Sequence, residues 1–391
     1  MSFSQVIDSN IFRFPLYSSN STQQFRLHLI TSDLWEAITG ERISPAKICQ
    51  FSDCSMPLAD ETPNNTALQA NQIISMAKDR QKSRILQLRL NDCSNEDKKI
   101  IFNAFFSHMN ELVADPTANF VVQKFCEVAN EAQKKEILNF FLSDPKYFVD
   151  HQIACRVLQK FIETTSVSNI DKIYLAMKKD LISYCLSPNG NHIVQRFVSA
   201  LSDRIYEIVE IIRPHVTMLA VDSYGCRVVQ KLFELHTVDK LQPLVDEVMK
   251  SCVELSMDQY GNYVVQYILA DKTQANVSKM INDLSGNFYK FSVHKFASNV
   301  IEKCIRGATS AQREKMFDEI LGGKDSYEAK RILQMVVDQF GNYVIQRIVE
   351  FGTSEQQNIV YDVVYDNYDR LIHESYAKHV ITKLQYLGFE F

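Results

Sequence analysis

Long apolar runs are missing from this 391-residue sequence. No stretch approaches the roughly 18 consecutive apolar residues that a membrane-spanning helix needs. The first residues also lack a basic segment followed by an apolar run, which would mark a secretory signal. We therefore expect an intracellular, cytoplasmic protein, and we interpret the glycosylation sequon Asn20-Ser21-Thr22 as a chance match.

Signatures of the common enzyme classes are also missing. The sequence contains no GxxxxGK(S/T) phosphate-binding loop, no HExxH zinc motif and no GxSxG nucleophile motif. Its nine histidines have no recurring Cys or Asp partner. We therefore expect neither enzymatic activity nor a cofactor.

The nine cysteines form no pattern of metal ligands or disulfides. Cys49 and Cys54 make a CxxxxC pair, but no second pair at metal-ligand spacing exists, so no zinc site is expected. Five other cysteines lie in apolar stretches with helical periodicity, which indicates reduced, buried thiols. They are Cys126, Cys155, Cys226, Cys252 and Cys304.

An excess of positive charge is missing as well, since the formal net charge is −5 at pH 7. Taken alone, this value argues against a nucleic-acid-binding protein. Net charge averages over all surfaces, however, and the two faces of a repeat protein need not carry the same charge.

What the sequence does contain is one five-residue pattern, the pentad, which recurs nine times. The first residues of successive pentads are 36, 36, 36, 35, 36, 36, 44 and 36 positions apart. A fixed period in this range predicts a solenoid of repeated helical units. The pentads of repeats one to nine are Ser83–Gln87, Asn119–Gln123, Cys155–Gln159, Asn191–Gln195, Cys226–Gln230, Asn262–Gln266, Ser298–Glu302, Asn342–Gln346 and Lys378–Thr382.

The chain divides into an arm without the period and a repeat array. Residues 1–66 mix polar residues, prolines and short apolar patches, so we expect an irregular, partly ordered arm. The array is expected over residues 67–391. In its second unit, apolar residues at helical spacing predict helices over 96–108, 118–128 and 131–142. Each unit then holds three helices, and the pentad opens the middle one.

Two flanking positions support helices that begin at the pentads. Four residues before each pentad, most side chains can cap a helix N-terminus or favour its dipole. They are Asp79, Asp115, His151, Ser187, Asp222, Asp258, His294, Asp338 and Glu374. Gly or Ala stands directly before eight pentads, which permits close approach to a neighbour. Pro116 is expected in the first turn of its helix, where its missing N–H costs nothing.

The outer pentad positions carry chemistry that suits nucleotide bases. Positions one and five are i and i+4 and project side by side, whereas positions three and four are always Val, Ile or Leu and are expected to face the core. Position five is Gln seven times, Glu once and Thr once. Two amides match the donor and acceptors of uracil, Ser or Cys with Gln suits adenine, and Ser with Glu offers a carboxylate to the two donors of guanine. The flat side chains at position two can stack on bases, a contact worth about 1–3 kcal/mol per base.

One base per helical repeat is the recognition mode of one class of RNA-binding proteins. The pentads and their order resemble the Pumilio/FBF (PUF) family of that class, over roughly Ala67 to Phe391. The resemblance implies an all-α fold: a curved right-handed α-solenoid of eight three-helix repeats with terminal capping units. It also implies that repeat one binds the 3′ end of single-stranded RNA and repeat eight the 5′ end.

The resemblance assigns a base to each of eight repeats. From repeat one to repeat eight the pairs are Ser83 and Gln87 for A, Asn119 and Gln123 for U, Cys155 and Gln159 for A, Asn191 and Gln195 for U, Cys226 and Gln230 for A, Asn262 and Gln266 for U, Ser298 and Glu302 for G, and Asn342 and Gln346 for U. The predicted site is therefore 5′-UGUAUAUA-3′. The ninth pentad departs from the pattern and should recognise no base. The expected stacking residues are Arg84, Phe120, Arg156, His192, Arg227, Tyr263, Asn299, Tyr343 and, at the 5′ end, His379.

The residue after the pentad is basic in seven of the nine repeats. These cations could line the inner surface and attract phosphates. The candidates are Lys124, Lys160, Arg196, Lys231, Lys303 and Arg347. The alternative is a ladder of salt bridges between repeats, and both can hold together.

The resemblance implies a monomeric post-transcriptional repressor that binds the 3′ untranslated region of mRNA and recruits protein co-repressors. The step of 44 residues places an insertion loop at about 321–329, where Leu321 and Tyr327 are candidates for partner contacts; a tolerated insertion is the alternative. A nine-base UGUAnnAUA site stays open, because curvature decides whether a central base is flipped out. A protein-binding scaffold of the armadillo or HEAT kind is the alternative function, but it would not need the same amide and small residue in every unit.

Overall fold

The computed structural model describes residues 63–270, 274–323 and 327–391, and side chains from residue 70 onward. The predicted arm apart from its last residues, the sequon and the Cys49–Cys54 pair lie outside these ranges. Residues Thr66–Phe391 form one compact unit, and every regular element in its described part is a helix. None of the helices in the described ranges is long and apolar enough to cross a membrane.

Each of repeats one to eight holds three α-helices of distinct position, and repeat nine holds two, α27 (Tyr368–Leu371) and α28 (Ala377–Tyr386). The pentad helices are α4 (Lys82–Asp92), α7 (Ala118–Val128), α10 (Ala154–Thr164), α13 (Gly190–Ala200), α16 (Gly225–Leu235), α19 (Gly261–Ala270), α22 (Ala297–Gly307), α25 (Gly341–Phe351) and α28 (Ala377–Tyr386). The short helices before them are α6 (Met109–Ala114), α9 (Pro145–Asp150), α12 (Leu181–Cys185), α15 (Val216–Ala220), α18 (Cys252–Met257), α21 (Phe288–Ser292), α24 (Ala329–Val337) and α27 (Tyr368–Leu371), with the longer α3 (Pro63–Lys78) in the first repeat. The outer helices that follow them are α5 (Asn95–Phe106), α8 (Glu131–Ser143), α11 (Val167–Met177), α14 (Ile205–Ile212), α17 (Val238–Val248), α20 (Gln274–Leu284), α23 (Ser310–Leu321) and α26 (Ser354–Tyr365).

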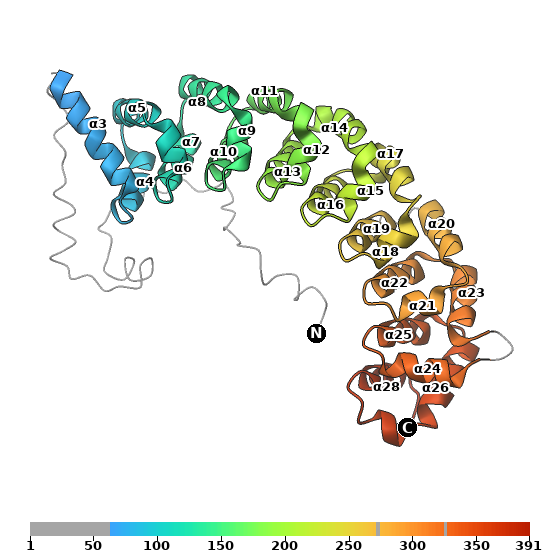
Figure 1. Ribbon diagram of the computed structural model, residues 1–391. Helices are drawn as coiled ribbons and strands as arrows, with labels where there is room; N and C mark the ends of the chain where they lie inside the picture. Colours follow the sequence, from blue (N-terminus) through green and yellow to red (C-terminus); the bar gives the residue numbers. More distant parts are fainter. Residues whose placement is uncertain (1–62, 271–273, 324–326) are drawn as a thin grey trace, which may run out of the picture. The chain divides into compact units, whose positions relative to one another are not determined.

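The repeats stack into a curved array. The pentad helices line its inner side in one row, and the outer helices form the other side (Figure 1). Each pentad helix packs against the pentad helix of the next repeat. The predicted curved α-solenoid of PUF-like repeats is therefore confirmed.

The core runs between the helix layers along the whole array. Pentad positions three and four are buried in every repeat except at Ile85, which is half-buried. Burying one such Val, Ile or Leu side chain stabilises the fold by roughly 1.5–3 kcal/mol. A single repeat cannot cover its own apolar faces, so stability comes from stacking. The five cysteines expected to be buried are buried and free.

The residue four positions before the pentad starts the pentad helix. In repeat two, one carboxylate oxygen of Asp115 accepts hydrogen bonds from the N–H groups of Thr117 and Ala118, at 2.8 and 2.7 Å. In repeat three, Nδ1 of His151 accepts the equivalent bonds. The same arrangement occurs at Asp79, Ser187, Asp222, Asp258, His294 and Asp338. These side chains satisfy N–H groups that the first helical turn leaves without partners.

Small residues before the pentad allow the expected close approach. A Cβ atom on Gly190 would lie 2.7 Å from the carbonyl oxygen of Tyr184, in the short helix of the same repeat. A Cβ atom on Gly225 would lie 2.8 Å from the carbonyl oxygen of Leu219. Both distances are below van der Waals contact, so glycine fixes how closely the two helices pack.

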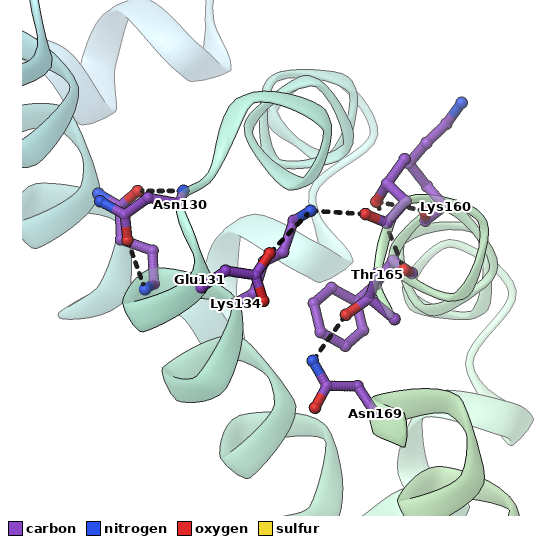
Figure 2. A network of polar contacts seen from close by, with 9 residues as sticks. Asn130, Glu131, Lys134, Lys160, Thr165 and Asn169 are labelled. Carbon is purple, nitrogen blue, oxygen red and sulfur yellow. Dashed lines mark hydrogen bonds and ion pairs between the residues drawn. The ribbon is translucent and has the colours of Figure 1, made fainter. Parts of the chain in front are cut away.

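Polar contacts join neighbouring repeats away from the pentads. Nζ of Lys134, in α8, donates a 2.7 Å hydrogen bond to the carbonyl oxygen of Thr164, at the C-terminus of α10 (Figure 2). A cation there interacts favourably with the helix dipole. Asn169 donates to the Thr165 hydroxyl, which ties the start of α11 to the same junction. Of these two bonds, the one from Lys134 links repeat two to repeat three.

Two local expectations were wrong. The helix expected over 96–108 ends at Phe106, and the short helix α6 follows it as a separate element. Pro116 lies in the turn before α7 rather than in its first helical turn, because Asp115 must reach forward to cap Ala118.

The insertion begins where α23 ends. Gly322 and Gly323 both have positive φ angles, 112° and 129°, which only glycine adopts readily. The Glu328 N–H then donates to the Leu321 carbonyl oxygen at 2.8 Å. Leu321 itself is buried in the core, whereas Tyr327 is exposed. The expectation that Leu321 contacts a partner is therefore wrong for this conformation, and Tyr327 alone keeps that candidacy.

Candidate nucleic-acid interface

Pentad positions one and five touch each other on the inner side of the array. In repeats two, four, six and eight, Nε2 of the position-five Gln donates a hydrogen bond of 2.9–3.0 Å to Oδ1 of the position-one Asn. The pairs are Gln123 with Asn119, Gln195 with Asn191, Gln266 with Asn262, and Gln346 with Asn342. The two positions project side by side as the i,i+4 spacing predicted.

The side chain of the position-one Asn is fixed by hydrogen bonds to backbone carbonyl oxygens at the start of its helix. Nδ2 of Asn119 donates to the carbonyl oxygens of Asp115 and Pro116, at 2.8 and 3.0 Å. Asn191, two repeats later, makes the two equivalent contacts within its own repeat. Its Oδ1 atom must then face the Gln. The four Asn side chains are at most 2% exposed, whereas the Gln side chains are half-buried. Asn therefore forms the floor of the site and orients the Gln amide, which presents an acceptor and a remaining donor.

The small position-one residues are equally buried. Sγ of Cys155 donates to the Gln152 carbonyl oxygen at 3.2 Å, and Nε2 of Gln159 lies 3.8 Å from that sulfur. Burial raises the pKa of the Cys155 and Cys226 thiols, so both stay neutral. Ser83 donates to the Arg80 carbonyl oxygen at 3.3 Å. These repeats have less hydrogen-bonding capacity at the floor than the Asn repeats.

Repeat seven has the only carboxylate among the position-five side chains. Burial raises the pKa of Glu302, and Arg347, Arg306 and Lys303 act in the opposite direction. The negative charge of Glu350 raises the pKa of Glu302 further. The carboxylate nevertheless has a cation beside it, since Nε of Arg347 lies 3.6 Å from its Oε2 atom.

The position-two side chains form an exposed row beside these pairs. Phe120, Tyr263 and Tyr343 are 49%, 53% and 37% exposed although they are large and mostly apolar, so part of each side chain lies at the surface. Arg84, Arg156, Arg227, His192, Asn299 and His379 are exposed as well. Partial desolvation by neighbouring atoms, assisted by the charge of Arg196, lowers the pKa of His192 although the side chain is exposed, so this ring is neutral at physiological pH.

A sequence profile of the Pumilio-family RNA binding repeat matches this chain over 72–104, 108–139, 151–176, 215–249, 251–284, 287–321 and 331–364. These segments make up more than half of the chain. The chain belongs to the Pumilio (PUF) family of RNA-binding repeat proteins. No segment matches between 176 and 215, yet repeat four, which lies there, has the same Asn191–Gln195 pair as the other Asn repeats.

Similar proteins include Pumilio homolog 12 of Arabidopsis thaliana, which is 30% identical over 182 residues, 45% of this chain and 30% of that protein. Fem-3 mRNA-binding factor 1 of Caenorhabditis elegans is 33% identical over 87 residues, 20% of this chain and 14% of that protein. The matched part of this chain spans less than a third of the length of these curated relatives.

Two solved structures share the fold over nearly their whole length. The crystal structure of PUF-8 in complex with PBE-RNA has a TM-score of 0.73 and 26% identity, covering 88% of this chain and 99% of that one. The Puf3 RNA-binding domain bound to a Cox17 RNA 3′ UTR recognition sequence has a TM-score of 0.71 and 26% identity, covering 87% and 99%.

The cations after the pentads of this PUF array form ion pairs. Glu127 binds Lys124 of its own repeat at 2.8 Å and Lys160 of the next at 3.2 Å; Glu163 likewise binds Lys160 and, at 2.5 Å, Arg196. A second run joins Glu302, Arg347, Glu350 and Lys383. The sequence predicted such a ladder as an alternative to phosphate contacts but did not identify its acidic residues. The signal was a Glu three residues after the cation in repeats two, three, five and eight.

Not every candidate phosphate contact belongs to the ladder. Lys231 pairs only within its own repeat, with Glu234 at 3.1 Å. Lys303 makes no ion pair with any residue in the described ranges. Phosphate contact by the six candidates stays a prediction, and five of them must share their charge with a glutamate.

The ninth pentad differs from the others as expected. Lys378 and Thr382 are exposed, whereas position one is at most 4% exposed in repeats one to eight. Repeat nine therefore lacks the buried Asn, Ser or Cys that lies beside the position-five side chain in repeats one to eight. Within the described residues, no group of three or more His, Cys, Asp or Glu side chains is placed to hold a metal ion.

Proposed function

We propose that this protein binds single-stranded RNA sequence-specifically and recognises UGUAUAUA. The four Asn–Gln pairs, which all make the same hydrogen bond, carry the proposal. Each Gln amide, oriented by its Asn, offers an oxygen acceptor and an N–H donor, which complement N3–H and a carbonyl oxygen of uracil. Reading one base per repeat with two or three side chains is the established mode of PUF repeats.

The remaining repeats fit the other bases of the site. Ser or Cys with Gln offers one amide edge for adenine, and the Glu302 carboxylate can accept both N1–H and N2–H of guanine. The exposed position-two row supports stacking against the base planes, with arginine in repeats one, three and five and an aromatic ring or His in repeats two, four, six and eight.

The biological setting is proposed from the relatives. Fem-3 mRNA-binding factor 1 is named for an mRNA, and the Puf3 structure contains a 3′ UTR sequence. We infer that this protein acts on the 3′ untranslated regions of mRNA in the cytoplasm, as a monomer that represses translation or message stability through recruited proteins. Exposed Tyr327 is the proposed partner contact. The proposal includes no catalytic step.

Binding of labelled UGUAUAUA and of singly substituted RNAs tests the proposal. We expect each substitution to weaken binding, and equal binding of all sequences would contradict it. The alternative function, a protein-binding scaffold, does not discriminate between bases and therefore predicts no preference among these RNAs. RNAs with one extra central base decide between the eight-base and nine-base sites.

A further inference from the structure

The guanine position of the site depends on whether one carboxylate is charged. An ionised Glu302 only accepts hydrogen bonds, which suits the adjacent N1–H and N2–H donors of guanine. A protonated Glu302 has one donor and one acceptor, which suits N1 and N6–H of adenine instead. Repeat one already contains the neutral counterpart, since Ser83 and Gln87 correspond to Ser298 and Glu302.

The surroundings of Glu302 make its ionisation conditional. The side chain is 23% exposed, and burial raises its pKa. On the repeat-six side, helix α19 contains no charged residue. On its own helix, Lys303 and Arg306 lower the pKa from a distance. The contact that reaches the carboxylate comes from repeat eight.

Arg347 provides that contact from the position after the eighth pentad. Its side chain is 14% exposed, its Nε atom lies 3.6 Å from Oε2 of Glu302, and its Nη1 atom bonds Glu350. Nε is buried and has no hydrogen-bond partner, because 3.6 Å is beyond hydrogen-bond length. Arg347 is thus divided between two carboxylates, of which Glu350 also pairs with Lys383 at 3.5 Å.

We propose that Arg347 is a positioning residue for base specificity: it keeps Glu302 ionised so that repeat seven recognises guanine, and without this support repeat seven recognises adenine. This inference rests on the proposed RNA-binding function. It gives Arg347 a role that acts through Glu302, rather than through contact with a phosphate. It also makes the identity of the second base depend on pH.

The test measures binding of UGUAUAUA and UAUAUAUA by fluorescence polarisation between pH 5 and pH 8. The wild type is expected to prefer the G RNA by roughly tenfold or more at pH 8, as a bidentate contact allows. The preference should fall on acidification. Arg347→Gln should move the midpoint of that fall to higher pH. Arg347→Lys, which keeps the charge, should restore it in large part.

Arg196→Gln is the matched control. Arg196 occupies the same position in repeat four and pairs with Glu163 at 2.5 Å, but its repeat has a neutral Gln. This variant is expected to affect both RNAs alike and to leave the midpoint unchanged. Equal midpoints in Arg347→Gln, Arg196→Gln and the wild type, or equal shifts in both variants, would overturn the proposal.

Two further variants guard against a folding defect. Glu350→Gln removes the competing carboxylate and should move the midpoint to lower pH; an unmoved or raised midpoint counts against the role of Arg347. Glu302→Gln should prefer the A RNA at every pH. A wild type that binds neither RNA would instead refute the proposed function itself, so the two failures are distinguishable.

Discussion

Nε2 of Gln266 donates a 2.9 Å hydrogen bond to Oδ1 of Asn262, one turn earlier in α19. Asn262 in turn donates to the Asp258 carbonyl oxygen at 2.8 Å, so one chain of bonds runs from the helix start to the half-buried Gln266 amide. The orientation of the Gln amide is therefore set before any base arrives, which reduces the entropy lost on binding.

Replacing Asn262 with alanine should remove that orientation. We predict that Asn262→Ala weakens binding of UGUAUAUA by roughly 1–3 kcal/mol, because Gln266 loses the acceptor that fixes its amide. Discrimination should fail at the third base, which repeat six is proposed to recognise. Competition with RNAs substituted at the third or the seventh base measures this. Loss of discrimination at the seventh base, the proposed partner of Asn119, would refute the register.

The cap residues should contribute stability rather than specificity. We predict that Asp258→Ala lowers the free energy of unfolding by about 1 kcal/mol, because the Tyr260 and Gly261 N–H groups lose a shared acceptor. Chemical denaturation measures the change. Glu374→Ala is the control: it occupies the same position in repeat nine, where the Glu side chain is exposed. A loss as large for the control would argue against capping as the cause.

The glycine before the pentad should not tolerate a methyl group. Within a helix, Gly→Ala ordinarily stabilises by about 1 kcal/mol. We predict the opposite for Gly225→Ala, because the new Cβ would lie 2.8 Å from a backbone oxygen of Leu219. Thermal unfolding should show a lower Tm. In Gly307→Ala the new atom meets only the side chain of Val277, so its Tm should fall less or rise.

The ion-pair ladder can be tested separately from the bases. Burial raises the pKa of Glu127, but Lys124 and Lys160 outweigh it, so the net pKa lies below its usual value. The stability from these pairs is therefore present at neutral pH and lost as the pH falls below about 4.5 toward the lowered pKa. At neutral pH we predict that Glu127→Gln costs at most about 1 kcal/mol, since exposed pairs contribute little.

The same substitution should affect RNA binding. With Glu127 neutral, Lys124 and Lys160 can attract phosphates without competition, so RNA affinity should rise and its salt dependence should steepen by about one unit of slope. Glu131→Gln makes the same charge change on outer helix α8 and should leave binding unaltered. Equal effects of the two variants would show a general charge effect instead.

Much of this molecule could be predicted from the sequence because the same pentad recurs in nine repeats. Nine aligned pentads predicted the stacked helices from their fixed period. They also predicted the caps such as Asp115 and the close approach at Gly190, since both are local features within one repeat. The burial of Asn119 could not be predicted, because it depends on where the Asp115 and Pro116 carbonyls point. The burial of Leu321 and the contact between Arg347 and Glu302 arise from packing between elements, which the period does not specify.

A binding selection over random RNA tests the central claim most directly. Purified wild-type protein is incubated with a random pool, and bound sequences are counted. The account predicts enrichment of UGUAUAUA, or of its nine-base UGUAnnAUA form, and a parallel selection with Ser298→Asn and Glu302→Gln combined should replace G by U at the second base. Enrichment of no ordered sequence, or G retained at that base by the double variant, would contradict the proposed recognition.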